Sequence, residues 1–101
     1  MPKLKTNKWD PSERLETQED MALYLEAALE DGDSSLISAA LGDIARSKGM
    51  ASIAEATGLG RESLYKSLSE TGNPELSTVL KVVEALGLKL TAVPLDSDRA
   101  A

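Results

Sequence analysis

Hydrophobic residues recur along this chain at three- and four-residue spacings, a pattern that predicts amphipathic helices. The first predicted helix begins near Thr17, whose hydroxyl can cap it with Asp20 as a capping-box partner. It ends at Asp31-Gly32. Its apolar stripe consists of Met21, Leu25, Ala28 and Leu29.

A second helix is predicted to start after Asp33, a good N-cap residue, and to run to Lys48-Gly49. Its apolar side is broad, so we expect this helix to lie at the centre of the core. That side comprises Leu36, Ile37, Ala40, Leu41, Ile44 and Ala45.

Two short helical segments are predicted between Met50 and Leu68, separated by Gly58-Leu59-Gly60. Two short helices joined by a tight glycine-containing turn are typical of a helix-turn-helix. The start and outer side of the second segment, where a recognition helix meets base edges, carry Arg61, Glu62, Ser63 and Lys66. The alternative is a helical hairpin that only packs.

A last helix is predicted to reach about Leu86, with Gly87 as its stop signal. Residues 88–93 then alternate apolar and polar, which predicts a single β-strand. A lone strand needs an edge to pair with, and the simplest edge is the same segment of a second subunit. We therefore expect dimerisation through Leu88, Leu90 and Ala92. Pairing with the N-terminal arm is the competing explanation.

The chain has 101 residues, enough for one domain with a modest core. We predict an extended or disordered arm over 1–14, one helical domain over 15–95 and a disordered tail over 96–101. In the arm, Trp9 is the only aromatic residue, and we expect it to pack on the body or to contact a partner protein.

Composition excludes several classes of function. The chain has no Cys and no His, which removes disulfides, thiolate metal sites and histidine-assisted catalysis. We therefore predict no enzyme, no cofactor and no metal. No apolar run approaches the ~20 residues of a membrane span, and the first residues lack the apolar stretch of a signal peptide. We expect a cytoplasmic protein with no membrane contact.

The net charge of −6 is unevenly distributed. Residues 15–34 contain seven acids and no base, whereas residues 44–81 contain five bases and four acids. The acidic first helix is either a solvated face or a surface for a basic partner protein. The candidate DNA-reading part is roughly neutral, so binding to DNA would require a dimer or a partner.

The chain resembles the lambda-repressor-like (XRE) helix-turn-helix family, and more narrowly the HigA-like addiction-module antidote proteins. The resemblance covers about Trp9 to Pro94. It depends on four stretches: WDPSERLETQEDMALYLEAALEDGD, LISAALGDIARSKGM, the two-helix unit ending in RESLYKSLS, and GNPELSTVLKVVEALGLKL. It implies an all-α fold: a five-helix domain with an extra N-terminal helix and a short C-terminal β-strand.

This resemblance implies an antitoxin that binds a small basic toxin of the RelE/ParE type, encoded beside it, and that represses its own operon as a homodimer. The family's DNA-reading positions correspond here to Arg61, Glu62, Ser63 and Lys66, with Tyr65 flanking. Ser52 and Asn73 would suit phosphate contacts. The toxin-binding candidates are Trp9, Tyr24, Glu26 and Glu30.

Two departures from the family pattern predict weaker DNA affinity. Met50 and Ala51 stand where a phosphate-binding Gln is common, and Gly60 replaces the usual Ser or Thr cap. Two alternatives therefore stay open: an XRE-type transcription regulator without a toxin partner, and a toxin-binding protein that no longer binds DNA.

Overall fold

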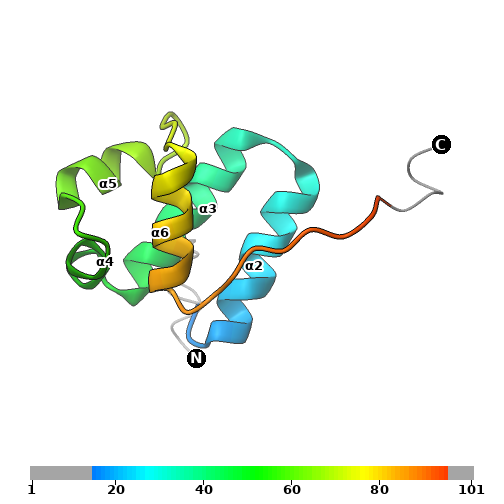
Figure 1. Cartoon of the computed structure of the whole chain (residues 1–101), viewed down its shortest axis with the longest axis horizontal. Coiled ribbons are helices and arrows are strands. Elements are labelled where there is room, and N and C mark those ends of the chain that lie inside the picture. The colour runs from blue at the N-terminus through cyan, green and yellow to red at the C-terminus, as the bar shows by residue number, and fades with distance from the viewer. Residues whose placement is uncertain (1–14, 96–101) are drawn as a thin grey trace, which may run out of the picture.

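The chain folds into five α-helices in the computed structural model, which describes residues 15–95 (Figure 1). This confirms the all-helical expectation. The arm and tail expected at 1–14 and 96–101 lie outside the described residues. The helices are α2 (Gln18–Asp31), α3 (Ser34–Lys48), α4 (Met50–Thr57), α5 (Arg61–Ser67) and α6 (Leu76–Ala85).

The two long helices begin at the caps that the sequence predicts. The Thr17 hydroxyl accepts the backbone N–H of Asp20 at 3.0 Å, and the Asp20 carboxylate accepts the N–H of Thr17 in return, which completes a capping box. At the start of α3, the Asp33 carboxylate accepts the N–H of Ser35 at 2.9 Å. These contacts fix where the chain enters each helix.

Helix α3 lies at the centre and contacts each of the other four helices. Its Leu41 and Ile44 are fully buried among apolar side chains from every helix. Gly42 faces the end of α5, where a Cβ on this residue would lie 2.0 Å from the carbonyl oxygen of Leu68. Glycine is required here because the two backbones approach too closely for any side chain.

The apolar faces of three helices are wider than the core they cover. Leu29 of α2 and Leu36 of α3 are 42% and 46% exposed, and Leu76 and Leu80 of α6 are 70% and 48% exposed. The expectation that Leu29 and Leu36 are core residues is therefore wrong. Helical periodicity gives the direction of an apolar face but not how far the neighbouring helices reach across it.

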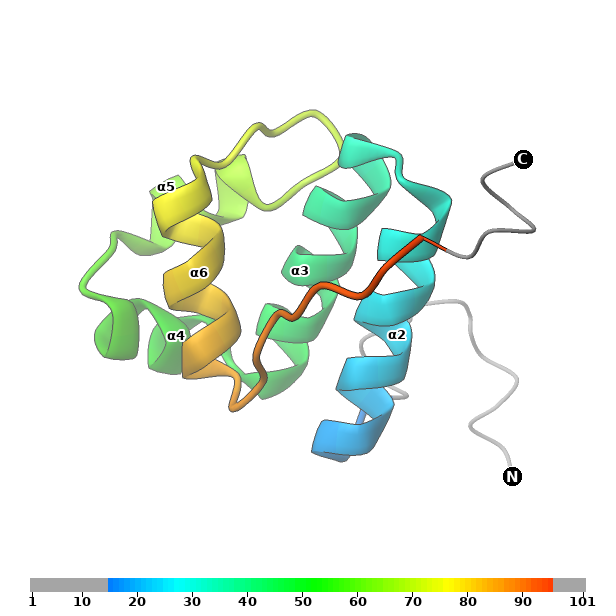
Figure 2. The ribbon, with the colours of Figure 1, turned by 45° about the vertical axis from the view of Figure 1, so that its right-hand side comes forward.

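The predicted C-terminal strand is not found in the described residues. After α6 the chain runs in an irregular path across α2, seen from two directions in Figures 1 and 2. The N–H of Leu88 bonds to the carbonyl oxygen of Val83 at 3.0 Å, and its side chain packs against the core. A strand needs a neighbouring strand to accept its backbone hydrogen bonds, and residues 15–95 contain none.

No helix within residues 15–95 is long and apolar enough to cross a bilayer. The longest is α3, with 15 residues.

Candidate nucleic-acid and protein interfaces

Helices α4 and α5 are held together by a short turn with its own hydrogen bonds. Gly58 has a φ of 76°, and its N–H donates to the carbonyl oxygen of Ala54 at 2.9 Å. The Thr57 hydroxyl donates to the carbonyl oxygen of Ile53 and accepts the N–H of Leu59. Sequence reasoning missed Thr57, although a hydroxyl just before a glycine turn is a usable signal.

Buried side chains set the orientation of α5. Ile53 of α4 and Leu64 of α5 are each 1% exposed, and Leu59 is half-buried between the helices. Leu59 and Leu64 thus both pack against the core. With Leu64 fixed inward, the residues on the opposite side of α5 must face outward.

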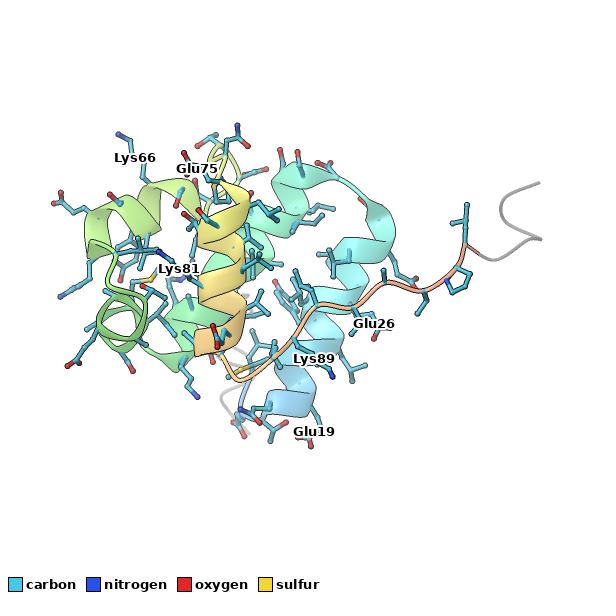
Figure 3. The ribbon with its side chains drawn as sticks, viewed as in Figure 1. Glu19, Glu26, Lys66, Glu75, Lys81 and Lys89 are labelled. Atoms are coloured by element: carbon cyan, nitrogen blue, oxygen red, sulfur yellow. The ribbon has the colours of Figure 1, made fainter. Side chains whose placement is uncertain are left out.

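All seven residues predicted to bind DNA have exposed side chains. They are Ser52, Arg61, Glu62, Ser63, Tyr65, Lys66 and Asn73. Arg61 makes no ion pair with any described residue, and in Figure 3 Lys66 points away from α5 toward solvent. Both cations are therefore accessible to a ligand.

The same region carries more acid than base. Between Gly49 and Glu75 the bases are Arg61 and Lys66, against four acids. Those acids are Glu55, Glu62, Glu70 and Glu75. Phosphate attraction, which drives most DNA affinity, is accordingly weak for one copy of this surface.

The short helices begin without side-chain caps. Gly49 and Gly60 are their N-cap residues, and neither helix start has a side-chain hydrogen bond. Met50 is 4% exposed and belongs to the core. Of the two residues predicted to weaken DNA affinity at the start of α4, Met50 therefore serves packing, whereas Ala51 is exposed.

A polar contact fastens α2 to α3. The Tyr24 hydroxyl donates to the Asp43 carboxylate at 2.5 Å, and the same carboxylate pairs with Arg46 at 2.6 Å. Sequence reasoning named Tyr24 as a toxin-binding candidate but missed its partner, because the contact joins residues on different helices. The three-residue spacing of Asp43 and Arg46 was the available signal.

The residues predicted to bind a toxin do not form one patch. Tyr24 and Glu26 are two positions apart on α2, so their side chains diverge by about 200° around the helix. Glu26 and Glu30 share a face, one turn apart. Trp9 lies outside the described residues.

An open apolar groove of about 300 Å³ runs between α2 and α3 on the side of Tyr24. Its walls are formed by Tyr24, Ala27 and Ala28 of α2 and by Leu36, Ala39 and Ala40 of α3. Asp43 completes the lining. Small side chains leave this groove open to an incoming group.

Within residues 15–95, no group of three or more acidic side chains is placed to hold a metal ion. The candidate surfaces in this part of the chain are thus the exposed side of α5, with Arg61 and Lys66, and the apolar groove between α2 and α3. Both are suited to binding macromolecules.

Comparison with known proteins agrees with a binding protein. The model of a family described as "Probable addiction module antidote protein" matches residues 5–94. An uncharacterized protein of Haemophilus influenzae is 48% identical over 81 residues, which are 80% of this chain and 84% of that protein. No solved structure was found to match the chain. Because the family match spans most of the sequence, the chain belongs to the family of probable addiction module antidote proteins.

Proposed function

We propose that this protein is the antitoxin of a type II toxin–antitoxin module and acts in the cytoplasm. It binds and neutralises a toxin of the RelE/ParE type, and it represses its own operon through α4 and α5. These helices would form the helix-turn-helix of a HigA-like, XRE-type domain with a lambda-repressor-like fold. Membership of the antidote family supports the toxin partner.

One observation carries the DNA-binding part of the proposal. Arg61 is exposed at the first turn of α5 and makes no ion pair with any residue in 15–95, while Leu64 is buried and fixes the rotation of that helix. Core packing gives no reason for a cation held in this way. In the proposed complex Arg61 binds a guanine edge with two hydrogen bonds, and Glu62 accepts one from a cytosine amino group.

The neighbouring polar residues would position α5 on the duplex. Ser63 and Lys66, with Tyr65 beside them, lie on the exposed part of the helix. Ser52 in the first turn of α4 and Asn73 in the loop after α5 would contact phosphates. The excess of acid around them requires that two copies bind together, as a homodimer on a two-fold operator.

The test is a mobility-shift titration with DNA from upstream of the protein's own operon. Arg61→Ala is expected to lose about 1–3 kcal/mol of specific binding. Lys89→Ala is the matched control, because it removes one positive charge from the segment after α6, away from α5. Equal operator affinity of Arg61→Ala and the parent protein would refute the reading role of Arg61.

A second candidate function is toxin binding without DNA binding. It is favoured by the two bases and four acids between Gly49 and Glu75 and by the uncapped starts of α4 and α5. The parent protein would then neutralise toxin in cells but shift no operator fragment. The remaining alternative, an XRE-type regulator without a toxin partner, would shift the operator and bind no toxin.

A further inference from the structure

Acidic and basic residues are distributed unequally between the first and second parts of the chain. Residues 15–45, which hold α2 and most of α3, contain eight acids and no base, whereas residues 46–95 contain six bases and five acids. The groove between α2 and α3 lies entirely within the acidic part. Any ligand of the groove must approach through this negative field.

We propose that this groove is the docking site for the toxin, and that it receives an apolar side chain from a lysine- or arginine-bearing segment. This inference rests on the proposed antitoxin function and adds the place and the chemistry of the contact. The arrangement is a helix-in-groove contact, in which an apolar face enters a hydrophobic groove and charges at the rim fix its orientation.

The lining favours a protein segment over a small molecule. Four of the residues are alanines, and the polar groups of Tyr24 and Asp43 already bond to one another. A small-molecule site usually encloses most of its ligand and offers several free polar groups. The four alanines instead allow the backbone of a partner helix to come close to α2 and α3. The distance between the axes of packed helices depends on the size of the side chains at the contact.

Exposed Leu36 provides an apolar contact at the groove. Its side chain is 46% exposed although it lines this hollow, so a partner that enters there would cover it. Asp31 follows Ala27 and Ala28 by four and three residues and therefore lies on the same side of α2. It places a carboxylate where a basic flank of the partner would lie.

Charge argues against the two other occupants. DNA phosphates would be repelled by eight carboxylates with no compensating base. A second copy that brought its own groove to this one would oppose two surfaces of the same strong negative charge. A basic protein gains from the same field.

The experiment measures binding of the purified toxin encoded beside this protein, using the full chain. In Ala27→Trp the indole would fill the groove from a position that is exposed. We expect toxin affinity to fall by about tenfold or more, mainly through faster dissociation. Ala22→Trp is the matched control, since it makes the same change about 140° around the same helix. It should bind toxin like the parent protein.

A second pair of variants tests the other wall. Leu36→Ala removes an exposed apolar contact and should also weaken toxin binding, while Leu76→Ala, on α6 and outside the groove, should not. Circular dichroism should show the parent helix content in all four variants. Operator binding should also be unchanged in each of them.

The outcomes separate this inference from the proposed function. Failure of the parent protein to bind the toxin would remove the antitoxin function and this docking site together. If the parent binds but Ala27→Trp and Leu36→Ala bind equally well, the antitoxin function stands and the groove is not the docking site. If Ala27→Trp changes the oligomeric mass and leaves toxin affinity intact, the groove belongs to a second copy, which also overturns the inference.

Discussion

At the scale of single residues, Gly42 of α3 lies directly against the backbone at the end of α5. The carbonyl oxygen of Leu68 occupies the space where any Cβ at this position would lie. Because Leu68 directly follows α5, this approach determines how near α5 can lie to α3. Backbone contact of this kind is invisible in hydrophobic patterning, and glycine within a helix looks unfavourable until its neighbour is known.

Gly42→Ala is expected to destabilise the fold by about 1–3 kcal/mol, because the added methyl group must push α3 and Leu68 apart. The better helix propensity of alanine, worth about 1 kcal/mol, opposes this effect but does not remove the clash. Chemical denaturation gives the measurement. Ser34→Ala, exposed at the start of the same helix, is the control and should stay within about 0.5 kcal/mol of the parent. A fully stable Gly42→Ala would show that the helices separate at no cost.

At the scale of elements, caps and turns were predicted best, because they depend on local chemistry. Thr17 with Asp20, and Asp33, have the predicted capping roles, and a glycine-containing turn separates α4 from α5 as predicted. The segment 88–93 was predicted as a strand because alternation is a local signal as well. A strand also requires a partner edge, which one chain's local pattern cannot supply.

Of the two candidate surfaces, part of the one on α5 could be predicted from the sequence, and the groove could not. Exposure of Lys66 follows from helical spacing, because it lies about 160° around α5 from the buried Leu64. Exposure of Arg61 does not, because Arg61 is three residues before Leu64 and lies on the same side of the helix. The groove was not predictable, because it depends on how far α2 and α3 diverge around their alanines. It also depends on Leu36, which belongs to the predicted apolar side of α3 but lies at the surface and lines the groove.

The uncapped start of α5 gives an element-scale prediction. Gly60 has a φ of −73° and a ψ of 143°, a conformation open to any residue, and a Cβ there would meet only the Ser63 hydroxyl oxygen, 3.9 Å away. Gly60→Ser would let the new hydroxyl accept the N–H of Glu62 or Ser63. We expect Gly60→Ser to be more stable than Gly60→Ala by about 0.5–2 kcal/mol, with the parent between them. Thermal unfolding of the three proteins measures this order. Equal stability of the serine and alanine variants would mean that no cap forms.

At the scale of the whole molecule, the segment after α6 begins packed against the core and continues with its side chains exposed. Leu88 packs on the protein's own core, while Leu90, Ala92 and Val93 are exposed. Of the three residues predicted for dimerisation, Leu90 and Ala92 are therefore the ones open to a second subunit. A proposed dimer that met at this segment would cover these two side chains.

Leu90→Asp is expected to convert the proposed dimer to monomers, because paired carboxylates would meet at the two-fold axis. Inserting Pro at Thr91 should do the same by removing a backbone donor. Sedimentation equilibrium gives the mass. Val93→Asp, at the opposite phase of the alternation, is the control and should remain dimeric. A dimer that survives Leu90→Asp would place the subunit contact elsewhere.

The unequal charge of the two parts of the chain predicts the kinetics of toxin capture. Reversing Glu26 and Glu30 to Lys together should slow association with a basic toxin by about tenfold at low salt, with less effect at high salt. Stopped-flow measurements at two ionic strengths test this. The same double reversal at Glu75 and Glu84 on the other part of the chain is the control, since it changes the net charge equally. Equal slowing by both pairs would mean that only net charge matters.

The two tyrosines of this chain lie on different surfaces, one on α2 in the groove and the other on α5 among the residues proposed to bind DNA. Since the sequence has no phenylalanine, isotope labelling of tyrosine rings would give an NMR spectrum with one set of signals for each surface. The Tyr24 ring, hydrogen-bonded to Asp43, would respond to toxin, and the Tyr65 ring to operator DNA. A single labelled sample could thus show whether the two ligands occupy the protein together or in turn.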